Sequence, residues 1–207
     1  MGCREPIGGR VKKFKTAVIL SGGRSSRMGR DKALLSFGGY SSLAEYQYRR
    51  LSKLFERVYI SAKEDKFEFD APLVLDAYPT SSPLVALVSI FEVLNLEEIF
   101  VLSVDAPFVT EEVIGQLYAV GDVTKSATVA KSRGGLEPLC AIYRASILPR
   151  AKEALEQGNH RLSDLLSHER VESVTIESSR LFMNLNHPSE YEEALSYQDL
   201  EHSSSII

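Results

Sequence analysis

The feature that most constrains this chain is a short apolar run that ends in two adjacent glycines. Residues 17–20, Ala-Val-Ile-Leu, are all apolar and include β-branched side chains, which predicts a buried strand. Ser21 follows, and then Gly22 and Gly23, which have no Cβ and can adopt positive φ angles that other residues avoid. A strand that ends in such a bend exposes backbone N–H groups to a ligand.

Positive side chains crowd the loop after the two glycines. Arg24, Arg27 and Arg30 lie within it, and Lys32 ends it. Backbone N–H groups and cations in one place suit a polyphosphate, which is our interpretation of the loop. The alternative is a glycine-rich turn in a basic region. The spacing fits neither the GxxxxGK[ST] pattern nor the GxGxxG pattern of the common phosphate loops.

Length and charge favour one domain that binds a small anion. With 207 residues, 44% of them hydrophobic, we expect a mobile leader at 1–15, a single domain at 16–200 and a tail at 201–207. The first fifty residues carry eleven Lys or Arg against three Asp or Glu, whereas the whole chain has a net charge of −4. A basic block without interleaved aromatic residues fits a bound polyanion better than nucleic acid, and the overall charge argues against a membrane surface.

Cysteine count and hydropathy exclude further classes. The two cysteines, Cys3 and Cys140, are too few for a disulfide framework or a metal cluster, and Cys140 is expected in the core. No apolar stretch reaches the roughly 18 residues that span a bilayer. The first fifteen residues lack the apolar core of a secretory signal, so we expect a cytoplasmic protein.

Strand-like and helix-like segments alternate along the first 120 residues. This order predicts a doubly wound, mostly parallel sheet with helices on both faces. We expect strands at 17–20, 58–61, 72–76, 99–104, 127–130, 138–143 and 171–176. Helices are expected from Ser41 or Ser42 to about Phe55, from Pro83 onward, after Thr110, and at 145–157, 161–167 and 188–200.

Polar side chains stand where the predicted strands end. The glycine loop follows the first strand, Ser61 ends the second, Asp76 ends the third, and Asp105 follows the fourth. In such a sheet ligands bind outside the carboxyl ends of the strands, so these groups should meet. A carboxylate near phosphates is a natural ligand for Mg²⁺, which we assign to Asp105. The alternative for both aspartates is an ordinary turn residue.

These residues together predict magnesium-assisted nucleotidyl transfer. The glycine loop would hold a triphosphate, and Lys32 would stabilise the charge that develops on the α-phosphoryl group and the departing pyrophosphate. A phosphate acceptor is already anionic near neutral pH, so the reaction needs no general base. Catalysis would then depend on positioning and electrostatic stabilisation.

Two stretches carry a resemblance to a known family. Leu20-Ser-Gly-Gly-x-Ser-x-Arg-Met-Gly-x-Asp-Lys-Ala-Leu-Leu35 resembles the LAGGxSxRMGxDKxLL opening of the molybdenum cofactor guanylyltransferases, with Ser21 as a departure from alanine. Val104-Asp105-Ala106-Pro107 is similar to the family's Cys-Asp-x-Pro element. The resemblance implies a three-layer αβα, Rossmann-like nucleotidyltransferase fold with a mostly parallel sheet.

The resemblance also implies roles for individual residues. Those that bind the nucleotide would be Leu20, Ser21, Gly22, Gly23, Lys32, Ser61, Asp76 and Asp105. The catalytic groups would be Arg27, Lys32 and Asp105. Mg²⁺ would be held by Asp105 and by an asparagine of the C-terminal Asn-x-Asn element, Asn184 or, as we assign it, Asn186.

Three further positions depart from the family pattern. Ser82 and Ala86 stand where the family's Gly-Pro-Leu-Ala-Gly has glycines, which puts the local contact geometry in question. His187 replaces a threonine and is interpreted as a helix-entry residue, because an oxygen-rich Mg²⁺ site does not call for imidazole.

The implied substrates are GTP and the terminal phosphate of molybdopterin, with guanine favoured by Gly22 and Gly23. Molybdopterin-handling proteins and molybdoenzyme chaperones are the implied protein partners. Two alternatives stay open: another nucleotidyltransferase, such as a molybdopterin cytidylyltransferase or a sugar-phosphate enzyme, and a non-catalytic nucleotide-binding protein.

Overall fold

A seven-stranded sheet forms the centre of the protein in the computed structural model, which describes residues 12–22, 31–78, 80–185 and 187–204. The strand order within these residues is β3-β2-β1-β4-β6-β5-β7. The strands are β1 (Phe14–Leu20), β2 (Phe55–Ala62), β3 (Leu73–Leu75), β4 (Glu98–Ser103), β5 (Ala127–Ser132), β6 (Gly135–Arg144) and β7 (Val171–Thr175).

The sheet is parallel except at β6. β1 pairs in parallel with β2 and β4, β2 with β3, and β5 with β7. β6 runs antiparallel to both of its neighbours, β4 and β5. The expectation of a mostly parallel sheet is therefore confirmed. The carboxyl ends of β1, β2, β3 and β4 lie at one edge of the sheet, where the sequence places its polar residues.

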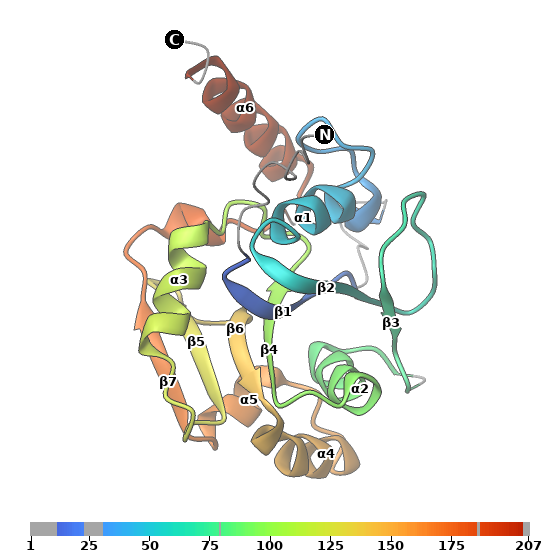
Figure 1. The fold of residues 1–207 in the computed structure, drawn as a ribbon, viewed down its shortest axis with the longest axis vertical. Coiled ribbons are helices and arrows are strands. Elements are labelled where there is room, and N and C mark those ends of the chain that lie inside the picture. The colour runs from blue at the N-terminus through green and yellow to red at the C-terminus, as the bar shows by residue number, and fades with distance from the viewer. Residues whose placement is uncertain (1–11, 23–30, 79, 186, 205–207) are drawn as a thin grey trace, which may run out of the picture.

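Helices cover both faces of this sheet (Figure 1). They are α1 (Leu43–Leu51), α2 (Pro83–Leu94), α3 (Glu111–Val120), α4 (Leu148–Glu156), α5 (Leu162–Ser167) and α6 (Pro188–Ser204), with the 3₁₀ helices η1 (Lys32–Leu34), η2 (Ala145–Ile147) and η3 (Ser179–Phe182). Alternate residues of β1 face opposite cores: Ala17 and Ile19 pack with α1 and α3, and Val18 and Leu20 with α2, α4 and α5. This two-sided burial explains why residues 17–20 of β1 form an unbroken apolar run.

Several predicted boundaries shift in the structure. The prediction of a helix to about Phe55 is wrong, because α1 ends at Leu51 and Phe55 begins β2. The Phe55 ring is fully buried, 5.2 Å from the ring of Phe14 and 5.5 Å from that of Phe100. These inter-strand contacts outweigh its helical spacing from earlier apolar residues.

The C-terminal half follows the expected order with smaller differences. The predicted helix at 145–157 divides into η2 and α4, with Pro149 in the first turn of α4, where a missing N–H is tolerated. Gly158 ends it with a φ of 74°. α6 continues past the expected end at residue 200 to Ser204, and it extends away from the sheet (Figure 1). None of the described helices is both long and apolar enough to cross a membrane.

Removing the Phe55 ring tests the importance of this buried aromatic group. We expect Phe55→Ala to lower the free energy of unfolding by about 3–5 kcal/mol, because the substitution leaves a cavity between β1, β2 and β4. Val93→Ala is the control, since Val93 on α2 is 57% exposed and its truncation should change stability by no more than about 0.5 kcal/mol. Equilibrium unfolding in urea measures both variants, and equal effects would contradict the assignment of Phe55 to the core.

Candidate active site

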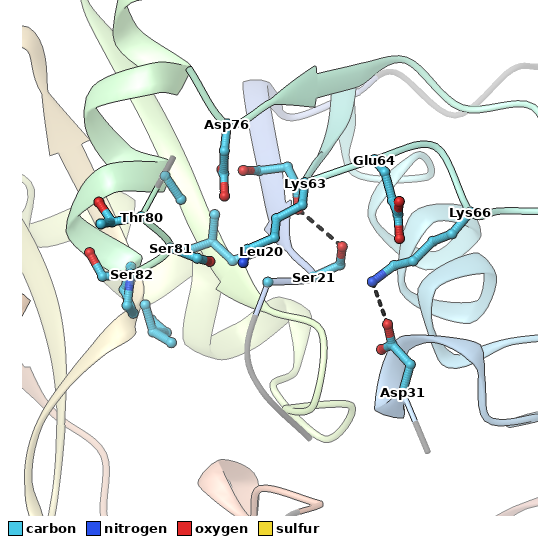
Figure 2. A pocket seen from close by; sticks show the side chains of 15 residues that line it. Leu20, Ser21, Asp31, Lys63, Glu64, Lys66, Asp76, Thr80, Ser81 and Ser82 are labelled. Atoms are coloured by element: carbon cyan, nitrogen blue, oxygen red, sulfur yellow. Dashed lines mark hydrogen bonds and ion pairs between the residues drawn. The ribbon is translucent and has the colours of Figure 1, made fainter. Parts of the chain in front are cut away.

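A cavity of about 610 Å³ opens at the carboxyl ends of β1, β2 and β3 (Figure 2). It is also bounded by the N-terminus of α2. Its described lining comprises Leu20, Ser21, Gly22, Asp31, Ser61, Lys63, Glu64, Lys66, Asp76, Thr80, Ser81, Ser82, Pro83, Ala86 and Leu139. The structure therefore brings five predicted nucleotide-binding residues, Leu20, Ser21, Gly22, Ser61 and Asp76, to one cavity.

Ser21 joins the ends of β1 and β2 at this cavity. Its backbone N–H and its hydroxyl group both donate to the carbonyl oxygen of Ser61, each at 3.0 Å. The hydroxyl thus has a structural partner that an alanine at this position would lack. The departure from the family's alanine adds a hydrogen bond between the two strands.

Gly22 does not adopt a left-handed conformation in this structure. It is absent from the described glycines with positive φ, so the freedom of glycine to adopt a positive φ is not used at this position. A Cβ at Gly22 would lie 3.9 Å from the hydroxyl oxygen of Ser81, which is ordinary contact distance. A side chain here would thus enter the space between the end of β1 and the loop before α2.

The N-terminus of α2 explains the departure at Ser82. Ser82 has an extended backbone with a φ of −154°, which any residue can adopt, and its hydroxyl oxygen accepts a hydrogen bond from the Val85 N–H at 3.1 Å. Pro83 occupies the first turn, as predicted. The serine therefore caps the helix where the family has a glycine, and α2 still directs its N-terminus to the cavity.

Asp76 is the half-buried carboxylate of the cavity. It directly follows β3, and its backbone N–H donates to the carbonyl oxygen of Ala62 at 3.0 Å. Burial raises the pKa of the Asp76 carboxyl, while the nearby ammonium group of Lys63 lowers it. Figure 2 shows Asp76 and Lys63 beside each other at the cavity. Burial disfavours the charged form of this carboxyl group. A carboxylate kept in a cavity in spite of this is a candidate for ligand binding.

Two of the three predicted catalytic groups, Lys32 and Asp105, form an ion pair. Lys32 Nζ donates to Asp105 Oδ2 at 2.9 Å, and their side chains are only 15% and 16% exposed. Ser103 Oγ donates to the other carboxylate oxygen of Asp105 at 2.5 Å. Neither Lys32 nor Asp105 belongs to the described lining of the large cavity, but Asp31, the neighbour of Lys32, does. Lys32 is thus adjacent in sequence to a residue that lines the cavity, while the Lys32–Asp105 pair itself lies outside the described lining.

A buried side chain that the sequence pattern does not predict holds the Asp105 loop. Gln47 on α1 is completely buried, and its Nε2 donates to the carbonyl oxygens of Ser103, Val104 and Ala106 at 3.4, 3.4 and 3.0 Å. These carbonyls flank Asp105 on both sides. The one signal in the sequence is that Gln47 lies four residues from both Leu43 and Leu51, on the buried face of α1.

Arg50 completes this network beneath the loop. Its guanidinium group donates to Gln47 Oε1, through Nε at 3.2 Å and Nη2 at 2.6 Å, and its Nη1 donates to the carbonyl oxygen of Val109. Burial lowers the pKa of Arg50. Both polar groups of the Gln47 amide are satisfied, which a buried side chain of this kind requires.

The C-terminal Asn-x-Asn element also reaches Asp105. The backbone N–H of Leu185 donates to the carbonyl oxygen of Asp105 at 3.1 Å, so half-buried Asn184 lies one residue from a direct contact with this loop. Asn186, Gly23 and Arg27 lie outside the described residues. The interpretation of His187 as a helix-entry residue is confirmed, because its backbone N–H donates to Glu190 Oε2 at 2.8 Å.

The carboxylate oxygens of Asp105 suit a hard cation, one that would also be bound by the phosphates of a substrate. Among the residues described, no cluster of three or more His, Cys, Asp or Glu side chains could hold a metal. Asp105 supplies carboxylate oxygens, and Mg²⁺ is commonly held by one or two carboxylates together with substrate phosphates and water. The residues at this site therefore fit such an ion. Cys140 is buried as predicted, and burial raises the pKa of its thiol to about 12.

Comparison with known proteins adds three findings. Residues 17–174 match the family described as "MobA-like NTP transferase domain". The chain is 38% identical over 177 residues to a protein of Campylobacter jejuni subsp. doylei named "Molybdenum cofactor guanylyltransferase", covering 84% of this chain and 92% of that protein. A protein of the same name from Helicobacter pylori G27 is 36% identical over 184 residues, covering 86% of this chain and 90% of that protein.

Solved structures agree on the fold. A structure titled as molybdopterin-guanine dinucleotide biosynthesis protein A from Archaeoglobus fulgidus superposes with a TM-score of 0.78. The two chains are 21% identical, and the match covers 89% of this chain and 99% of the other. At this identity the likeness concerns the fold alone.

Substituting Asp76 tests the cost of its burial. Since its pKa is raised in the folded protein, the folded state binds the proton more tightly than the unfolded chain does, and ionisation at neutral pH destabilises the fold. We expect Asp76→Asn to be more stable than the wild type at pH 7, with a gain that vanishes as the pH falls below about 3.9, the value of an unperturbed Asp. Thermal unfolding at pH 7, 5 and 3.5 measures this, and a pH-independent difference would contradict it.

Removing the Gln47 amide tests the support of the Asp105 loop. We expect Gln47→Leu to lower the free energy of unfolding by about 1–3 kcal/mol, because three loop carbonyls and the Arg50 guanidinium lose their partner. The control is Gln157→Leu, at the exposed end of α4, for which we expect a change within about 0.5 kcal/mol. Equal urea midpoints for the two variants would show that the buried network adds nothing to stability.

Proposed function

The chain belongs to the MobA-like NTP transferase family, and on this premise we propose that it transfers GMP from GTP to the terminal phosphate of molybdopterin. The products are molybdopterin guanine dinucleotide and pyrophosphate. The names of the relatives at 36–38% identity support this choice of substrates. The structural observation that carries the proposal is the 2.9 Å contact between Lys32 and Asp105, two groups 73 residues apart in the sequence.

The large cavity is proposed to hold the nucleoside part of GTP. Its volume of about 610 Å³ lies within the usual range for small-molecule sites. An ionised Asp76 presents only hydrogen-bond acceptors, which match the adjacent N1–H and N2–H donors of guanine. The capped N-terminus of α2 adds a positive dipole end at the same cavity.

The triphosphate is proposed to extend from this cavity toward Lys32 and Asp105. We assign Mg²⁺ to the Asp105 carboxylate, with Asn186 as a further oxygen donor. When bound, such an ion would neutralise charge on the phosphates. Ser103 orients the Asp105 carboxylate, and Gln47 fixes the backbone on either side of it.

Lys32 is proposed to act on the reacting phosphate. Its ammonium group would exchange part of its contact with Asp105 for the α-phosphoryl oxygens and the departing pyrophosphate. An oxygen of the molybdopterin phosphate forms a bond to the α-phosphorus of GTP as the bond to the bridging oxygen of the β-phosphate breaks. The second pKa of the acceptor phosphate is about 6. The phosphate is therefore largely ionised at neutral pH, and its attack needs no general base.

This assignment also bears on where the protein works. GTP and molybdopterin are charged and water-soluble, so we propose a cytoplasmic reaction. We propose that molybdopterin-handling proteins supply the acceptor and that molybdoenzyme chaperones receive the dinucleotide.

Arg27 is assigned to the triphosphate with Lys32.

Product formation tests the proposed function directly. The protein is incubated with GTP, Mg²⁺ and molybdopterin, and both pyrophosphate and the guanine dinucleotide are measured. Calorimetry then compares GTP with CTP, and we expect tighter binding of GTP. Tighter binding of CTP would favour a cytidylyltransferase, and no product with intact acceptor would favour a non-catalytic nucleotide-binding protein.

Removing the Lys32 ammonium group tests the mechanism. We expect Lys32→Met to lower kcat by about 10²–10³, equivalent to about 2.7–4 kcal/mol, if the group stabilises the transition state as other such donors do. Lys53→Met, an exposed lysine just after α1, is the control and should keep the wild-type rate. Circular dichroism checks that both variants fold, and a Lys32→Met rate near that of the control would refute the assignment.

A further inference from the structure

A lysine and an aspartate bridge two loops at the edge of the large cavity. Lys66, from the loop between β2 and β3, lies with its Nζ 2.5 Å from Oδ2 of Asp31, and Figure 2 shows it pointing toward that carboxylate. We propose that Lys66 is a positioning residue, which acts through Asp31 to hold η1 in place and thereby fixes the Lys32 ammonium group against Asp105. This inference rests on the proposed function for its effect on rate.

Both oxygens of the Asp31 carboxylate are engaged, and in different directions. Oδ1 accepts a hydrogen bond from the Ala33 N–H at 3.0 Å and so caps the first turn of η1. Oδ2 accepts from Lys66. The carboxylate therefore connects the β2–β3 loop to the backbone of the turn that begins with Lys32. A displacement of this turn would move the Lys32 side chain with it.

The turn itself is too short to fix this position. η1 contains only three residues, Lys32–Leu34, and 3₁₀ helices have weaker hydrogen-bond geometry than α-helices. Ala33 is completely buried and anchors one side of the turn, while Leu34 is 43% exposed. The Lys66 contact constrains Asp31, the residue on the other side of Lys32 from Ala33.

The burial of the bridge suggests an effect on rate more than on stability. The Lys66 and Asp31 side chains are 20% and 34% exposed, so solvent still reaches the pair and reduces its contribution to folding. Catalysis is more sensitive, because displacements of about 1 Å can reduce a rate by about 10²-fold. The Lys66 pair should therefore matter most where Lys32 must meet the phosphate.

Direct binding of the nucleotide by Lys66 is the competing explanation, since both Lys66 and Asp31 line the cavity. The two explanations predict different kinetics. Loss of a contact that binds substrate and transition state equally raises KM, whereas misplacement of Lys32 lowers kcat. They also differ in the effect of the Asp31 charge, whose loss should lower kcat as the loss of Lys66 does, with KM unchanged, only if the two side chains act as one bridge.

The test combines variants of both partners with a matched control. We expect Lys66→Met to lower kcat about tenfold while KM for GTP changes by less than about twofold, and Lys66→Arg to restore most of the rate because it keeps the charge. Asp31→Asn keeps an oxygen to cap Ala33 but loses the charge, so it should resemble Lys66→Met. The double variant should lose no further rate, because both changes break one bridge. The control is Lys15→Met, which removes the Lys15–Glu56 pair (2.9 Å) at the first residues of β1 and β2, far from the site.

A second readout does not depend on activity. Hydrogen exchange of the peptide that covers residues 31–37 should be faster in Lys66→Met than in the wild type and unchanged in Lys15→Met. If the wild type makes no dinucleotide, the proposed function fails while exchange still tests the bridge. Unchanged exchange in Lys66→Met, or a raised KM with an unchanged kcat, would overturn the proposal.

Discussion

The ion pair between Lys32 and Asp105 is the contact on which the rest of the site depends. Two opposite charges that are about 85% shielded from solvent stabilise each other, and either alone would be unfavourable there. Much of the surrounding structure keeps them in contact: Gln47 and Arg50 hold the Asp105 loop from below, and Asp31 caps the turn that carries Lys32. A polyphosphate with its cation offers both groups new partners of the right sign. The pair therefore keeps both charges compensated within the protein.

The fold, and the meeting of Ser61 and Asp76 with the glycine bend at one cavity, could be predicted from the sequence because both follow from local patterns. β-branched apolar runs marked the central strands, Pro83 marked the start of α2, and the strand-end rule placed Ser61 and Asp76 beside the glycine bend. Gln47 and Lys66 could not be predicted in this way. Each acts through a partner distant in sequence, Gln47 on carbonyl groups near Asp105 and Lys66 on Asp31, so nothing in its own neighbourhood indicates the role. The end of α1 was misplaced for the same reason, since Phe55 is fixed by rings on β1 and β4.

Two departures from the family pattern, Ser21 and Ser82, have physical explanations in this chain. Ser21 adds a hydrogen bond between β1 and β2, and Ser82 caps α2, so each serine gains a local partner. Asp76 behaves differently, because its burial raises its pKa and disfavours the charged form. The first two positions contribute to folding, whereas the third reduces stability in a place where a ligand could use the charge. Such a division is usual where binding and stability compete for the same residues.

β6, the one strand of the described sheet that runs antiparallel to its neighbours, affects how the sequence around this site can change in evolution. Because β6 runs against β4, the two-residue link between β5 and β6, Arg133 and Gly134, emerges at the same edge as the carboxyl ends of β1 to β4. A hairpin link can lengthen without changing the pairing of other strands, whereas the parallel half is joined by crossovers whose helices pack on the sheet. The Arg133–Gly134 link can therefore lengthen by insertion while the parallel half of the sheet, with Ser61 and Asp76 at its strand ends, stays unchanged. Insertions there would add side chains at the edge where the polar strand ends lie, without moving those ends.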